Sequence, residues 1–148
     1  MLNYKKSEEN IRQYMHEGYI RKVLPDKNII AILSKNSEES LETANFLMQN
    51  NKSSLWIIVC SYYSMYYIAN AVICKHGYKV GRKISHAVTY DTLVVFIKNK
   101  LEKRLLEDYK DAMEEAADIA RTESEMIIES FGGAKRFIET MKLMLAER

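Results

Sequence analysis

The chain has 148 residues, a net charge of +2, one proline, five glycines and two cysteines. That length fits a single domain with a real core, and helix interiors exclude proline and disfavour glycine. We therefore expect one all-α domain over residues 1–148, an up-and-down bundle of four main helices with one or two additional helices. The first ten residues have no apolar stretch of the kind that a signal peptide needs, so we expect a cytoplasmic protein.

The first predicted helix runs from about Glu8 to Val23, where apolar residues recur at helical spacing. Pro25 ends it, because proline cannot continue a helix. Asp26 can then cap a second helical segment that extends to the polar turn at 50–53. Whether that segment forms one helix or two stays open.

The third predicted helix, which Ser53 or Ser54 can cap and Gly77 ends, has no charged residue or histidine between Leu55 and Cys74. Four tyrosines, two serines and an asparagine interrupt its apolar residues. A membrane span would hold those phenols at mid-bilayer depth, whereas tyrosine is usual at the interfaces. We therefore expect a buried core helix and no membrane contact.

Cys60 and Cys74 both fall on this predicted helix. At about 1.5 Å of rise per residue they would lie roughly 21 Å apart, which is far beyond disulfide reach. We expect buried thiols at both positions.

After the turn that follows Gly77, Ser85 can cap a helix that begins at His86. Residues 89–97 are rich in β-branched side chains, which are typical of strands. We predict helix there because nothing else in the chain offers a strand partner. A fifth helix is expected over 105–120.

The last part of the chain contains the consecutive glycines Gly132 and Gly133. We expect them to interrupt the chain before a final helix over 134–145, because glycine is unfavourable in a helix interior.

Charge is unevenly distributed along the chain. Residues 1–74 have a net charge of +1, residues 75–104 contain 8 basic and 2 acidic residues, and residues 105–148 have a net charge of −5. Two interpretations stay open: complementary helices of one bundle, or a basic surface for a polyanion or an acidic partner.

Five segments together resemble one family. They are LETANFLMQN (41–50), SYYSMYYIANAVICKHGYK (61–79), SHAVTYDTLVVF (85–96), AMEEAADIAR (112–121) and AKRFIETMKLML (134–145). Over nearly its whole length the chain resembles the HEPN domains (higher eukaryotes and prokaryotes nucleotide-binding), including the small stand-alone prokaryotic members. The resemblance implies a helical bundle that pairs as a homodimer and is often encoded beside a small nucleotidyltransferase.

Many HEPN members are RNases, commonly toxins of toxin-antitoxin pairs, whose motif is an arginine followed after a short spacer by a histidine. The resemblance assigns these roles to Arg82 and His86, which are separated by three residues, one short of the motif. A histidine near its ordinary pKa can move the proton of a ribose 2′-hydroxyl. An arginine can stabilise charge that grows on phosphoryl oxygens. This first hypothesis, an RNase acting as a dimer, needs no metal or other cofactor.

The second hypothesis is a non-catalytic HEPN module that binds a nucleotide or a nucleotidyltransferase partner. Its binding residues come from the basic turn and the central helix: Lys79, Lys83, Tyr62, Tyr66 and Asn70. In the RNase hypothesis the two lysines line the RNA cleft. The tyrosines can be core and dimer packing with hydroxyls at the rim, or a stacking platform for a base.

Some toxin members carry a tyrosine just after the histidine that the partner transferase modifies, and the nearest one here is Tyr90. His16 follows Arg12 at the same spacing as His86 follows Arg82, but the residues around His16 predict an exposed helix face.

The acidic residues Glu114, Glu115 and Asp118 are expected to form a solvated face, because no histidine is spaced to join them as a metal ligand. No P-loop, dinucleotide fingerprint or zinc spacing occurs in the sequence.

Overall fold

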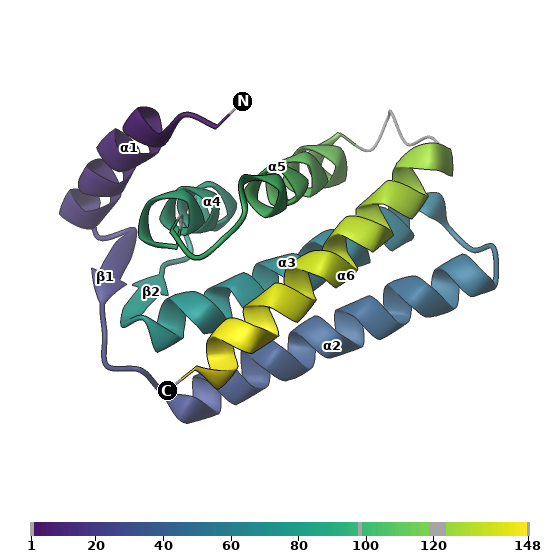
Figure 1. Cartoon of the computed structure of the whole chain (residues 1–148), viewed down its shortest axis with the longest axis horizontal. Helices are drawn as coiled ribbons and strands as arrows, with labels where there is room; N and C mark the ends of the chain where they lie inside the picture. Colours follow the sequence, from purple (N-terminus) through teal and green to yellow (C-terminus); the bar gives the residue numbers. More distant parts are fainter. Residues whose placement is uncertain (1, 98, 119–123, 148) are drawn as a thin grey trace.

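The computed structural model describes residues 2–97, 99–118 and 124–147, and it confirms the all-α prediction (Figure 1). The helices are α1 (Tyr4–Glu17), α2 (Lys27–Gln49), α3 (Ser54–Lys75), α4 (Ser85–Phe96), α5 (Lys103–Ala117) and α6 (Ser124–Ala146). Two short strands, β1 (Ile20–Lys22) and β2 (Tyr78–Val80), pair antiparallel.

Helix α3 is the centre of the bundle. Helices α2, α4, α5 and α6 all pack against it, and α2 and α6 follow it along most of its length (Figure 1). By length and composition α3 could cross a membrane, but 67% of its most apolar window is buried inside the protein. The buried Ser61 and Ser64 donate to helix carbonyls, and Ser37 of α2 donates to the Ser64 carbonyl at 2.6 Å. A buried polar group without such a bond would destabilise the core.

The predicted first helix is wrong at both ends. It begins at Tyr4 and ends at Glu17, because Gly18 adopts φ 76° and its N–H bonds the Met15 carbonyl. A left-handed glycine is a common helix stop. The residues assigned to the last helical turn, Ile20–Lys22, instead form β1 and pair with β2, which a pattern confined to one segment could not reveal.

Two other boundary predictions need correction. Ser85 does not cap α4: it is the first helical residue, and Ile84, with φ 44°, precedes it without a side-chain cap bond. Gly132 and Gly133 do not interrupt α6, which is continuous. Their cost of about 1 kcal/mol each in a helix is outweighed by burial of the residues beyond them, among which Phe137 is fully buried.

Several smaller predictions are confirmed. The second segment is one helix, and the Asp26 carboxylate caps it by accepting from the Asn28 and Ile29 amides. Ser53 accepts from the Trp56 amide and caps α3. Residues 89–96 are helical. The predicted end of the fifth helix at Ala120 lies outside the described residues.

Two side chains tie the ends of the chain to the bundle. Asp91 of α4 accepts hydrogen bonds from Ser7, Asn10 and Tyr14 of α1. Lys75, in the last turn of α3, donates to three carbonyls at the C-terminal end of α6, at Met144, Leu145 and Glu147. A cation suits that end of a helix, where carbonyls have no helical partner.

Candidate functional site

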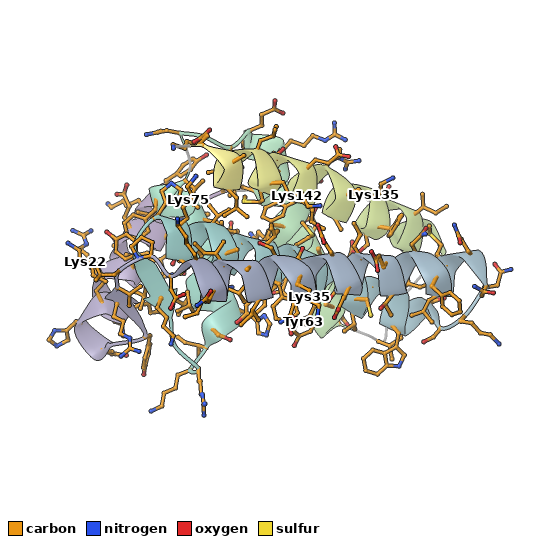
Figure 2. All side chains as sticks on the ribbon, turned by 90° about the horizontal axis from the view of Figure 1, so that it is seen from below. Lys22, Lys35, Tyr63, Lys75, Lys135 and Lys142 are labelled. Atoms are coloured by element: carbon orange, nitrogen blue, oxygen red, sulfur yellow. The ribbon has the colours of Figure 1, made fainter. Side chains whose placement is uncertain are left out.

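His86 lies in the first turn of α4 and packs into the tyrosine cluster of α3. Its ring centroid is 4.6 Å from that of Tyr66, 5.4 Å from Tyr62 and 5.7 Å from Tyr63. In Figure 2, Tyr63 lies below the ribbon of α2, whereas Lys75, Lys135 and Lys142 lie above it. Tyr63 is therefore on the face opposite to those lysines.

A chain of hydroxyl groups leads from the core to this histidine. The Tyr62 hydroxyl lies 2.6 Å from Nδ1 of His86 and 3.4 Å from the hydroxyl of Tyr109, which is fully buried on α5. Within the described part of the chain, Tyr109 has no other hydrogen-bond partner for its hydroxyl.

The direction of these hydrogen bonds follows from the acceptor that each hydroxyl proton needs. If Tyr62 donated to Tyr109, the Tyr109 proton would be buried without an acceptor, at a cost of about 1–3 kcal/mol. We therefore infer that Tyr109 donates to Tyr62 and that Tyr62 donates to Nδ1 of His86. A neutral imidazole that accepts at Nδ1 carries its proton on Nε2. The free edge of His86 is then a hydrogen-bond donor.

The surroundings keep both groups uncharged at neutral pH. Burial lowers the pKa of His86 below its ordinary value. Burial raises the pKa of Tyr62 far above that of free tyrosine, so that its hydroxyl remains a donor. His86 and Tyr62 open into a cavity of about 220 Å³, whose other lining residues are Val59, Tyr63, Met113, Ala116 and Ala117.

Arg82 does not share this cavity. It lies with Lys83 on the turn between β2 and α4, as expected, and both side chains are exposed. Together with Tyr19 and Gly81 they line a separate cavity of about 230 Å³. Within one chain, the arginine and the histidine of the expected motif therefore open to different spaces.

The remaining expected binding residues meet in a third place. Tyr66, Asn70 and Lys79 line a groove of about 450 Å³ between the β1–β2 ribbon, α2 and α3. Arg21 lines it as well, although nothing in the sequence marked this residue, because its position depends on the pairing of β1 with β2. Tyr109 was likewise not among the expected site residues.

Tyr90, the expected modification site, is half-buried on α4. Its ring lies parallel to that of Tyr109, with centroids 6.5 Å apart. Burial, followed by the negative charge of Asp91, raises the pKa of Tyr90 to about 12. Its hydroxyl is therefore a weak nucleophile at neutral pH.

The other candidate residues lie on the surface or inside the core. Arg12, His16, Glu114 and Asp118 are exposed, while Glu115 is half-buried and burial raises its pKa. Among the described residues, no group of three His, Cys, Asp or Glu side chains is placed to hold a metal ion. Both cysteines are free: Cys74 is buried as predicted, and Cys60 is half-buried.

Comparison of the chain with protein-family models, with curated proteins and with solved structures finds no match.

Proposed function

We propose that this chain is a HEPN-like module that binds a phosphate group of RNA or of a nucleotide at His86. The observation that carries the proposal is the hydrogen-bonded chain Tyr109–Tyr62–His86, which leaves Nε2–H as the free donor of a histidine that lines a cavity with Tyr62 and Tyr63. A phosphate oxygen is a natural acceptor for that donor. The faces of Tyr62 and Tyr63 offer a surface on which a base can stack.

The same tautomer disfavours a general base at His86. A base must take a proton at Nε2, and this places the imidazole proton on Nδ1, where it would donate to Tyr62 and leave the Tyr62 proton without its acceptor. Donation of a hydrogen bond to phosphate requires no rearrangement. Binding is therefore the activity that this geometry favours.

A metal-independent RNase is the second candidate, and one observation favours it. Arg82 and His86 lie on one short segment, with Arg82 exposed in the turn that leads into α4. Pairing of two copies, as the resemblance implies, would bring the arginine of one chain to the histidine of the other. The homodimer and a small nucleotidyltransferase partner belong to this proposal.

Binding is tested by fluorescence anisotropy with a labelled RNA oligonucleotide and by calorimetry with nucleotides. His86→Ala should weaken binding about tenfold or more, because one hydrogen bond to a charged group contributes about 1.5–3 kcal/mol. His86→Gln keeps an N–H donor and should bind nearly as well as the parent chain. His16→Ala is the matched control, since that histidine lies on an exposed helix face. Equal affinities for the parent chain and His86→Ala would overturn the proposal.

The RNase candidate is distinguished from simple binding by proton transfer, because glutamine can donate a hydrogen bond but cannot act as a general acid or base. A pool of structured RNAs is incubated in excess EDTA with the parent chain, Arg82→Ala and His86→Gln. Cleavage that disappears in both variants but persists in Arg12→Ala would establish an RNase. Absence of cleavage, together with binding by His86→Gln, would support the non-catalytic module.

A further inference from the structure

The groove beside the β1–β2 ribbon is separate from the His86 cavity, and it combines an apolar wall with cationic side chains. It measures about 450 Å³, within the usual range for small-molecule sites. Aromatic and aliphatic side chains form most of its wall, among them Tyr67, Leu33 and Val23, and its cations lie on the ribbon.

Two cations face one another across that ribbon. Arg21 of β1 is directly opposite Lys79 of β2 in the antiparallel register, and both line the groove. Like charges at opposed positions destabilise a strand pair. Neither side chain takes part in an ion pair among the residues that the structure describes. The ribbon therefore places two positive charges, neither in an ion pair with a described residue, on the wall of an apolar groove.

Asn70 supplies a polar contact on the α3 side of the groove. Its Nδ2 donates to the Tyr66 carbonyl at 2.9 Å and to Thr89 Oγ1 at 3.2 Å, so both amide hydrogens are used. The Tyr66 carbonyl fixes the orientation of the Asn70 amide, because a flipped amide would place its Oδ1 against that carbonyl oxygen, and both are acceptors. Asn70 can therefore offer a ligand only its Oδ1 acceptor.

Asp26 is the one acidic residue among those that line the groove. Its Oδ1 accepts from the Asn28 and Ile29 amides at the N-terminus of α2. That end of a helix carries partial positive charge, which offsets the carboxylate. The field in the groove is therefore set mainly by Arg21 and Lys79.

We infer that this groove binds an aromatic phosphate monoester that also carries an N–H or O–H donor. A phosphate monoester has a charge of about −1.5 to −2 near neutral pH, which matches the two cations of the ribbon. The aromatic ring lies along Tyr67 and Leu33, and the donor group meets Oδ1 of Asn70. The inference does not depend on the function of His86, because none of its charged contacts lines the His86 cavity.

The test uses 4-aminophenyl phosphate, which combines the three features, followed by amide chemical shifts in NMR titrations. Phenyl phosphate lacks the donor and 4-aminophenol lacks the phosphate, so each should bind at least fivefold more weakly. Shifts are expected in β1, β2 and the C-terminal half of α3.

Arg21→Ala and Lys79→Ala should each weaken binding at least fivefold, and the double variant should abolish it. Lys22→Ala is the matched control, because Lys22 is an exposed cation of the same ribbon that does not line the groove. Circular dichroism checks that each variant folds, and loss of the like-charge pair should leave the melting temperature unchanged or raised. Equal affinity in the Arg21 and Lys79 variants, equal affinity for 4-aminophenol, or no shifts near the ribbon would each overturn the inference.

Discussion

Ser7 donates a 2.7 Å hydrogen bond to the carboxylate of Asp91, 84 residues further along the chain. Asn10 and Tyr14 donate to the other oxygen of that carboxylate, each at 3.1 Å. Asp91 is 6% exposed, and these three donors are neutral side chains. A buried carboxylate without a cation is tolerated when donors surround it in this way, and the donors all come from α1.

Asp91→Asn should destabilise the protein by about 1–3 kcal/mol, because one acceptor becomes an amide donor that faces the α1 donors. Urea denaturation followed by circular dichroism measures the change. Glu42→Gln, at an exposed position on α2, serves as the comparison and should change stability by less than about 0.5 kcal/mol. Equal effects in the two variants would show that the Asp91 bonds do not hold α1.

Alkaline pH should release the same contact. Burial, and then the charge and hydrogen bond of Asp91, raise the pKa of Tyr14 to about 12, whereas an unfolded tyrosine titrates near pH 10. The folded chain thus binds this proton more tightly, and its contribution to stability is complete below pH 10 and is lost between about pH 10 and 12. Tyrosinate absorbance, compared with Tyr14→Phe, locates the step. A Tyr14 titration near pH 10 would contradict it.

Mild acid should also reduce stability, through His86. Because burial lowers the pKa of this imidazole in the folded state, the unfolded chain binds protons more readily as the pH falls through about 6.5. The contribution of His86 is therefore complete above that value and declines below it. Denaturant midpoints between about pH 7.5 and 5.5 should fall more steeply in the parent chain than in His86→Gln. An identical pH dependence of the midpoint in the two chains would contradict a lowered pKa for His86.

Gly132→Ala should stabilise α6 by about 0.4–1 kcal/mol, since alanine favours the helix and restricts the unfolded chain. A Cβ there would meet only the end of the Arg136 side chain, at 3.5 Å. Gly18→Ala provides the opposite case, because φ 76° disfavours any Cβ although space is open. Thermal unfolding should rise in the first variant and fall in the second.

Lys75→Met should loosen the end of α6. It keeps the aliphatic length but removes the ammonium that bonds the Met144 and Leu145 carbonyls. We expect faster amide hydrogen exchange in the last turn of α6 and a loss of about 1–2 kcal/mol. Lys142→Met removes only an exposed ion pair with Glu38 and should cost less than about 1 kcal/mol.

Local sequence patterns predicted most of the helices. They failed where the secondary structure depends on contacts with segments that are distant in the sequence. The cap at Asp26 and the apolar spacing of α2 depend only on neighbouring residues of the same helix, and the structure confirms both. The strand at Ile20–Lys22 exists because β2 lies beside it, and no signal within those residues separates it from helix. The predicted break at Gly132 and Gly133 is wrong, because burial of the residues that follow them, such as Phe137, cannot be deduced from the local pattern.

The candidate site divides in the same way. The contact of His86 with the tyrosines of α3 depends on how α4 packs on α3, and the role of Tyr109 depends on how α5 packs. The expected residues Lys79, Arg82 and His86 are close in sequence, yet they line three separate cavities. Spacing along a chain does not determine direction once a segment leaves regular helix.

The attachment of α1 and β1 also sets an order of events during synthesis. The ribosome makes α1 and β1 before their docking partners, β2 and the Asp91 carboxylate, which emerge only after the whole of α2 and α3. Until then α1 and β1 lack these partners, while α2 and α3 can already pack on each other. Helix α1 and strand β1 are thus made before α2 and α3 but can dock only after them.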